Sequence, residues 1–203
     1  MSHNTWVHRI ARRLIVRPLA RVGATPNPVT TARLAIGLSA AACLALGTEG
    51  WRLAGAGLFV VSFLLDRADG DLARTTGQTS PGGHTYDLVS DAVCNALTFV
   101  GLGLGLTGSS LGLWAVPMGL LAGGAVAAIL VLVMRIESLR GARAGELKGV
   151  AGFDPDDAIL VVPVAIALGA AQGLLTAAAV GAPAFALFFF ALLRRRLAAD
   201  GAG

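Results

Sequence analysis

Apolar residues fill most of the chain in six long runs, which short polar or charged segments separate. The runs cover residues 27–47, 52–74, 85–106, 111–134, 156–174 and 176–193. A helix of about 20 residues crosses the roughly 30 Å of hydrocarbon in a bilayer, because each residue adds about 1.5 Å. The pattern therefore predicts an all-α, polytopic membrane protein with six transmembrane helices.

The segment that precedes these runs has a different pattern. In "MSHNTWVHRIARRLIVRPLARVG", Trp6, Ile10 and Leu14 recur every four residues, and arginines stand between them. Such a pattern favours an amphipathic helix on an anionic membrane surface, with a solvated basic tail as the alternative. We expect a surface helix in residues 1–25 and a six-span membrane domain in residues 26–203.

Composition and charge agree with this division. Of the 203 residues, 55% are hydrophobic and 14% are charged, whereas soluble proteins average about 25% charged residues. Cations gather before the first run, at Arg67 and Arg74 near the end of the second run, after the fourth run, and at Arg194, Arg195 and Arg196. The positive-inside rule then places both termini and both charged loops on the cytoplasmic side of a membrane, which we expect to be bacterial. The basic pI reflects this topology, and no nucleic-acid partner is expected.

Five aspartates interrupt the apolar pattern around the end of the second run and the start of the third, and four of them form two pairs. Asp66 and Asp69 are three residues apart near the end of the second run, and Asp87 and Asp91 are four apart at the start of the third. Residues at these spacings share one face of a helix. The intervening "TTGQTSPGG" is rich in residues that end helices and form turns. A helical hairpin would bring the two pairs of carboxylates face to face at the cytoplasmic end.

A bare cluster of this kind is costly in a membrane, since each carboxylate loses hydration and like charges repel. Divalent cations would offset that cost. Carboxylate ligands without cysteine favour Mg²⁺, Mn²⁺ or Ca²⁺, and two such ions about 3.5–4 Å apart suit phosphoryl chemistry. A solvated acidic loop is the alternative, and the helical spacing on both sides of the turn disfavours it.

These residues resemble the signature of the CDP-alcohol phosphotransferases, which are also called CDP-alcohol phosphatidyltransferases. That signature reads D-x-x-D-G-x-x-A-R and, after about eight residues, G-x-x-x-D-x-x-x-D. Every fixed position is matched, at Asp66, Asp69, Gly70, Ala73, Arg74, Gly83, Asp87 and Asp91. The resemblance extends over nearly the whole chain. It implies an enzyme of phospholipid biosynthesis that transfers a phosphatidyl group from a CDP-linked lipid, such as CDP-diacylglycerol, to an acceptor alcohol and releases CMP.

The resemblance also implies roles for individual residues. Asp66, Asp69 and Asp87 would bind two divalent cations, Mg²⁺ or Mn²⁺, and Asp91 would complete the metal site and act as general base on the attacking hydroxyl. The nucleotide would be bound by Asp69, Gly70, Ala73, Arg74 and Gly83, and Arg74 would bind phosphate or order the acidic cluster. Asp71 lies outside the signature, and we interpret it as a supporting or solvated residue.

The acceptor alcohol is left open by the sequence. Arg33, in "TPNPVTTAR", stands inside the first run, where a cation is expensive unless it faces a polar cavity or pairs with an aspartate. Candidate acceptor-binding residues are Arg33, Arg135, Arg140, Arg143 and Lys148. Such a cationic set suits a phosphorylated polyol, such as glycerol 3-phosphate or inositol phosphate. Alternatively, the cations of this loop take no part in acceptor binding and only hold the loop on the cytoplasmic side of the membrane. Three nearby acids are Asp154, Asp156 and Asp157. An aspartate that caps the fifth helix before Pro155 explains part of this set, and the alternative is contact with acceptor hydroxyls or an ammonium, which argues against a phosphorylated acceptor.

Two other classes of protein compete with this interpretation. A cation transporter also places acids within spans, but it needs a polar route through both leaflets, and here the polar residues gather at one end. A catalytically inactive relative is the other alternative. The glycine-rich third and fourth runs, with "GLGLGLTG" and "LLAGGAVAA", suit close helix contacts, and we expect a homodimer in the membrane.

Overall fold

The protein is described by a computed structural model, which places residues 12–21, 23–140 and 159–200. Within these ranges it is built from helices and contains no strand, as the sequence predicts. The elements are η1 (Arg12–Val16), α2 (Arg17–Arg21), α3 (Pro26–Ala45), α4 (Glu49–Thr76), α5 (Pro81–Gly105), η2 (Gly112–Trp114), α6 (Ala115–Arg140), α7 (Val161–Ala167) and α8 (Ala171–Asp200).

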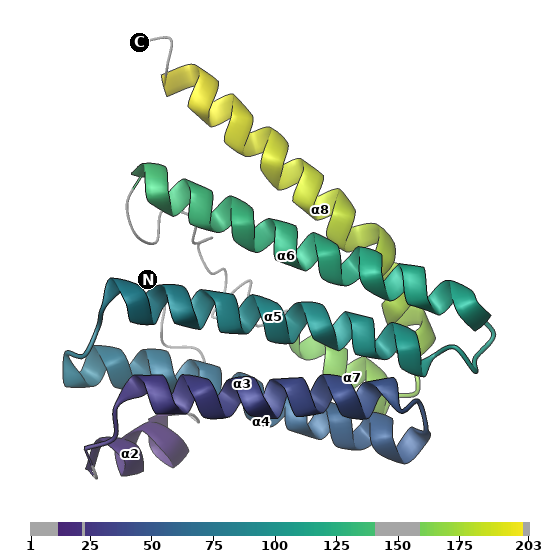
Figure 1. The fold of residues 1–203 in the computed structure, drawn as a ribbon, viewed down its shortest axis with the longest axis horizontal. Coiled ribbons are helices and arrows are strands. Elements are labelled where there is room, and N and C mark those ends of the chain that lie inside the picture. The colour runs from purple at the N-terminus through teal and green to yellow at the C-terminus, as the bar shows by residue number, and fades with distance from the viewer. Residues whose placement is uncertain (1–11, 22, 141–158, 201–203) are drawn as a thin grey trace.

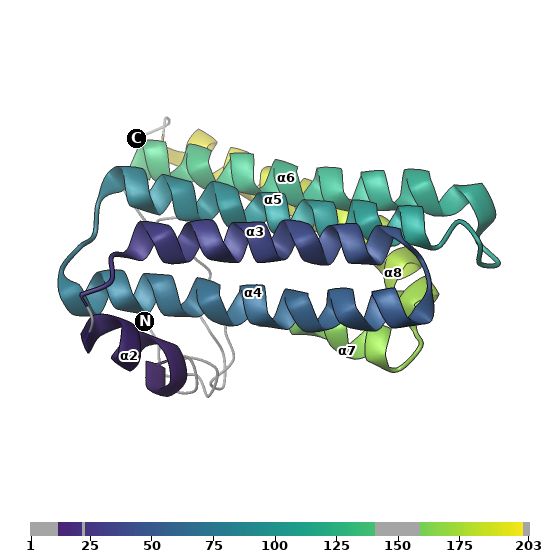
Figure 2. The ribbon, with the colours of Figure 1, turned by 60° about the horizontal axis from the view of Figure 1, so that its bottom comes forward.

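Four long helices, α3 to α6, run up and down beside one another (Figures 1 and 2). Helix α3 packs against both α4 and α5, and α5 packs in turn against α6. Helix α8 contacts α6 and diverges from the other helices toward the C-terminus (Figure 1), while the short α7 packs on α4. The C-terminal end of α4 and the N-terminal ends of α3 and α5 therefore meet at one end of the molecule.

Four segments are long and apolar enough to cross a membrane, namely Pro26–Ala45, Pro81–Gly105, Gly112–Ile136 and Ala171–Leu192. They correspond to the first, third, fourth and sixth predicted runs. Helix α4 covers the second predicted run, but Asp66, Arg67 and Asp69 make it too charged to belong to this set. The fifth predicted run begins at residue 156, outside the described residues. An integral membrane protein is thus supported by four spans, and the count of six stays a prediction.

The predicted boundary between the fifth and sixth runs, near Gly173, is wrong. Helix α7 ends at Ala167, and Gly169 then adopts a left-handed conformation with φ of 74° before α8 begins at Ala171. Gly173 instead lies within α8. Apolar residues continue through this turn, so hydropathy does not mark it, whereas the turn depends on one glycine in a conformation that other residues adopt at a cost.

The described part of the N-terminal segment contacts protein with its apolar side. Val16 is buried against Val29, Ala68 and Leu72, which belong to α3 and α4. Four arginines of the segment are exposed, Arg12, Arg13, Arg17 and Arg21. Trp6 and Ile10, on which the predicted surface helix also depends, lie outside the described residues, so the surface helix stays a prediction.

Glycines of α5 and α6 allow these helices to approach closely. A Cβ atom on Gly103 would lie 2.6 Å from the carbonyl oxygen of Ala115, and one on Gly119 would lie 2.6 Å from that of Phe99. Gly101 faces the carbonyl of Ala41 on α3 in the same way. Small residues let helix backbones touch in lipid, as the sequence suggests. Because these glycines already serve contacts within one chain, they do not argue for the predicted homodimer, which stays a prediction.

Candidate metal centre

Three aspartates converge where α4 ends and α5 begins. The carboxylates of Asp66, Asp69 and Asp87 each offer an oxygen atom, and these atoms all lie within 4.8 Å of one another. Two of the acids come from the last turns of α4 and the third from the second turn of α5. The predicted hairpin therefore forms, and it brings carboxylates from both helices to one place.

The turn between α4 and α5 is determined by local sequence. Gly77 ends α4 in a left-handed conformation with φ of 69°. Ser80 then caps α5, because its side-chain oxygen accepts a hydrogen bond from the backbone N–H of Gly83 at 3.0 Å, and Pro81 occupies the first helical position. These are the residue types that terminate and start helices at low cost. The "TTGQTSPGG" segment thus positions the acids as predicted.

Arg33 of α3 reaches into the middle of the aspartates. Its side chain is 1% exposed. The guanidinium Nη1 atom lies 2.5 Å from Asp66 Oδ1 and 3.5 Å from Asp91 Oδ1, and Nη2 lies 2.9 Å from Asp87 Oδ1. Nη2 also donates to the backbone carbonyl of Asp87 at 2.7 Å, and Nε is 3.7 Å from Asp69 Oδ2. Of the two roles that the sequence leaves open for Arg33, these contacts correspond to pairing with aspartates.

Thr30, one helical turn before Arg33, binds the most buried of the three acids. Its hydroxyl donates to Asp69 Oδ2 at 2.7 Å, and the other carboxylate oxygen, Oδ1, is buried and accepts no hydrogen bond. A buried carboxylate oxygen without a partner is costly unless a cation binds it. The donor set consists of carboxylates alone, as Mg²⁺ and Mn²⁺ prefer. The three aspartates therefore fit a divalent cation.

Asp91 occupies a different position from the triad. It lies one helical turn beyond Asp87 on α5, and 49% of its side chain is exposed. Its Oδ1 accepts a hydrogen bond from Asn95 Nδ2 at 3.1 Å and is near Arg33. Asp91 is thus beside the cluster but more open to solvent than Asp69. Its predicted role as a metal ligand and general base stays a prediction.

Asp71 is buried, so its interpretation as a solvated residue is wrong. Its side chain is 1% exposed and pairs with Arg74 and with Arg12 of the N-terminal segment. The sequence gives little sign of this, because Asp71 belongs neither to the apolar face nor to the signature. Arg74, for which the signature implies phosphate binding or ordering of the acids, contacts Asp71 rather than the metal-ligand candidates.

The small residues of the signature line the same end of the molecule. A Cβ atom on Gly70 would be no nearer than 3.4 Å to any neighbour, the neighbour being Arg74 Nη1. The protein's own packing therefore does not demand glycine there, and a ligand that approaches the backbone would. A Cβ on Gly83 would lie 3.0 Å from the Ser80 hydroxyl. Ala73 lies on α4, directly before Arg74. Their nucleotide-binding roles stay predictions.

The predicted acceptor-binding residues are only partly described. Arg135 is exposed near the end of α6, and Arg140 is the last residue of that helix. Arg143, Lys148 and the acids Asp154, Asp156 and Asp157 lie outside the described residues. Sequence reasoning missed Thr30, although its spacing of three from Arg33 places both on one face of α3.

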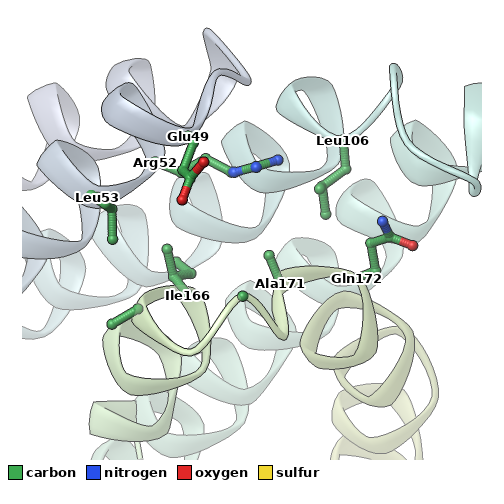
Figure 3. Close-up of a pocket in the computed structure, with 9 residues that line it drawn as sticks. Glu49, Arg52, Leu53, Leu106, Ile166, Ala171 and Gln172 are labelled. Atoms are coloured by element: carbon green, nitrogen blue, oxygen red, sulfur yellow. The ribbon is translucent and has the colours of Figure 1, made fainter.

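A cavity of about 130 Å³ lies at the opposite end of the bundle (Figure 3). It is bounded by the start of α4, the end of α5 and the turn between α7 and α8. Glu49, Arg52 and Gln172 supply its polar side chains. None of the residues that line it belongs to the acidic cluster.

Comparison with known proteins agrees with this geometry. A model of the CDP-alcohol phosphatidyltransferase family matches residues 24–180. A solved structure of Mycobacterium tuberculosis phosphatidylinositol phosphate synthase, in complex with manganese and citrate, has a similar fold. It shares 21% sequence identity with a TM-score of 0.63, and the match covers 90% of this chain and 88% of that one. A comparison with the curated proteins found no match.

Proposed function

The chain belongs to the CDP-alcohol phosphatidyltransferase family, and we propose that it transfers a phosphatidyl group from a CDP-linked lipid to an acceptor alcohol, releasing CMP. The observation that carries this proposal is the triad of Asp66, Asp69 and Asp87, in which a buried Asp69 oxygen has no hydrogen-bond partner. CDP-diacylglycerol is the proposed donor, and the proposed cofactors are two Mg²⁺ or Mn²⁺ ions.

In this proposal the triad holds the cations, and Arg33 and Thr30 keep the carboxylates in place. The cations supply charge neutralisation for the diphosphate and for the CMP that leaves. The acceptor hydroxyl oxygen forms a bond to the phosphorus that carries diacylglycerol, and the bond from that phosphorus to the CMP oxygen breaks. Asp91 accepts the hydroxyl proton, which suits a carboxylate that is half exposed beside the triad.

The acceptor is proposed to be a phosphorylated polyol. Arg135 and Arg140 lie toward the end of α6, on the side of the molecule where the chain also leaves α4, and Arg143 and Lys148 follow in sequence. The solved structure with a similar fold is named for the synthesis of phosphatidylinositol phosphate. Both observations support an acceptor such as inositol phosphate or glycerol 3-phosphate, because arginine and lysine bind phosphate groups well.

The end of the bundle that holds Asp66, Asp69 and Asp87, called the acid end below, is proposed to face the cytoplasm of a bacterium. Both termini are proposed to lie on that side. The cations of the N-terminal segment, of residues 135–148 and of residues 194–196 support this orientation. A reporter fused to either terminus should report a cytoplasmic location, and an external signal from one terminus would contradict the even number of spans.

The decisive experiment measures CMP release by purified protein in mixed micelles with CDP-diacylglycerol. Acceptors are compared one at a time, with glycerol 3-phosphate, inositol phosphate, inositol, serine and choline as the set. We expect one acceptor to raise CMP release and yield the matching lipid, EDTA to stop it, and Mg²⁺ or Mn²⁺ to restore it. Metal-independent release would contradict the proposed cation site. Divalent-ion flux in sealed vesicles without nucleotide would instead support a transporter.

A further inference from the structure

Asp71 is a buried carboxylate that the family signature does not include. Its two oxygens accept hydrogen bonds from arginines of different segments. Oδ1 accepts from Arg74 Nη2 at 2.7 Å, and Oδ2 accepts from Arg12 Nη2 at 3.3 Å. The carboxylate is 1% exposed, whereas Arg74 is 32% exposed and Arg12 49%. Asp71 thus cannot reach a ligand itself, but both of its partners can.

The arginine that Asp71 holds lies beside the metal centre. Arg74 follows Gly70 by one helical turn, and its guanidinium atoms lie 3.4–3.8 Å from where a Gly70 Cβ would be. Gly70 directly follows Asp69, a member of the triad. Of the five N–H donors of a guanidinium, only one of Arg74 is engaged by a hydrogen bond within the described residues. Among the described residues, none engages the other donors, and the guanidinium that carries them lies against Gly70, the residue after Asp69.

We propose that Asp71 is a positioning residue that holds Arg74 for the diphosphate of the CDP-linked donor, with Arg12 as a second anchor from the N-terminal segment. This inference rests on the proposed function, since it takes the donor to be a cytidine diphosphate ester. It assigns a role to Asp71 that goes beyond the metal ligands and the base.

Holding Arg74 in place favours donor binding because an exposed arginine side chain is otherwise mobile. An arginine side chain carries about 2 kcal/mol of rotamer entropy, which must be lost when it binds a ligand. A buried, charge-assisted hydrogen bond restricts Arg74 before the donor arrives, and less entropy then remains to be lost. Two arginines that share one carboxylate also retain one net positive charge, which attracts a diphosphate.

An apolar contact also holds the N-terminal segment against α4. Val16, four residues after Arg12, is buried against Ala68 and Leu72 of α4. The apolar contact and the Arg12–Asp71 pair therefore fix the same segment against the same helix. Movement of this segment away from α4 would leave Asp71 with Arg74 alone.

The first test compares the donor KM of the wild type with that of Asp71→Asn and Asp71→Glu. We expect Asp71→Asn to raise the donor KM about tenfold, with kcat and the acceptor KM changed by less than about threefold. A tenfold change corresponds to about 1.4 kcal/mol. Asp71→Glu should recover part of the loss because it restores the carboxylate. A rise in the acceptor KM in place of the donor KM would overturn the assignment to the donor.

A double-mutant cycle separates positioning from a general structural role. If Asp71 acts through Arg74, Asp71→Asn should have no further effect on the donor KM in an Arg74→Gln background. Additive effects of the two substitutions would overturn the inference. The same cycle is measured by titrating CDP in the presence of Mn²⁺, which requires no turnover.

Arg12→Gln and Arg13→Gln form a matched pair. Arg13 is exposed and adjacent to Arg12, so its substitution removes the same charge without removing an anchor. We expect Arg12→Gln to raise the donor KM about threefold more than Arg13→Gln does. Equal effects would remove Arg12 from the proposal. This pair also tests the anchor if Asp71→Asn does not fold, since Asp71 and Arg74 are both retained.

The wild type distinguishes failure of this inference from failure of the proposed function. If the wild type neither binds CDP with Mn²⁺ nor releases CMP, the proposed function fails and this inference falls with it. If the wild type does both and Asp71→Asn matches its donor KM and CDP affinity, only the role of Asp71 is overturned.

Discussion

The two ends of the helical bundle place charged residues in opposite ways. At the acid end, Arg33, Asp69 and Asp71 are each no more than 2% exposed, and ion pairs or hydrogen bonds join each of them to other charged groups. At the other end, Glu49 lies exposed in the first turn of α4 and Arg52 is half-buried beside a small cavity (Figure 3). An acid in the first turn of a helix is favourable on its own, so the position of Glu49 is explained without a ligand.

At the acid end, charged side chains are buried in spite of the free-energy cost of removing them from water. Taking a carboxylate or guanidinium out of water costs several kcal/mol per group, and pairing returns only part of this. A protein that tolerates this cost at one end and avoids it at the other has a use for the buried charges.

Asp91→Asn should lower kcat about 100- to 10,000-fold, since general bases contribute this much to proton transfer. Binding of CDP-diacylglycerol should be largely retained, because the triad is intact. Turnover and nucleotide binding are measured side by side on the same preparation, with Glu49→Gln at the far end as the matched loss of a carboxylate. Retained turnover in Asp91→Asn would remove this residue as the base.

Arg33→Gln should lower the free energy of unfolding by about 3–5 kcal/mol, because it removes a buried cation that four carboxylates contact, including the buried Asp69. Unfolding in detergent is followed by circular dichroism, with the exposed Arg13→Gln as control. Added Mn²⁺ should recover part of the loss in Arg33→Gln, since it supplies positive charge to the same carboxylates. Equal stability of the two variants would show that the buried network is not held by Arg33.

Thr30→Val should weaken Mn²⁺ binding about tenfold, as expected for the loss of one hydrogen bond to a buried carboxylate. The neighbouring Thr31→Val provides the control, because the Thr31 hydroxyl contacts Tyr86 at 3.0 Å and not the triad. Metal affinity is measured by titration calorimetry on both variants. Similar affinities would contradict the role of Thr30 in orienting Asp69.

Arg52→Gln should change kcat and both KM values by less than about twofold, which is the smallest effect in this series. Arg52 lies at the far end, where no residue of the acidic cluster lines the cavity. Steady-state kinetics with the acceptor that the CMP-release experiment identifies provide the measurement. A large effect would show that the two ends are coupled, and the contrast between them would then need revision.

Much of the fold and most of the acidic cluster are predictable from sequence because they depend on local properties. Hydropathy predicted six spans, including the four that the structure supports, and spacings of three and four residues placed each aspartate pair on one helical face. Gly77, Ser80 and Pro81 predicted the turn through their own backbone preferences. The turn at Gly169 was misplaced, since apolar residues surround both it and Gly173.

Local patterns in the sequence specify an all-helical membrane protein with an acidic hairpin that fits divalent cations. The packing of the helices, in contrast, places Arg33 among four aspartates, brings Thr30 to Asp69, and lets Asp71 join Arg12 to Arg74. Hydropathy, helical spacing and turn preference act over a few residues. The contacts of Arg33 and Thr30 with the aspartates of α4 and α5, and of Asp71 with Arg12, depend on how α3, α4, α5 and the N-terminal segment pack, which no local pattern specifies.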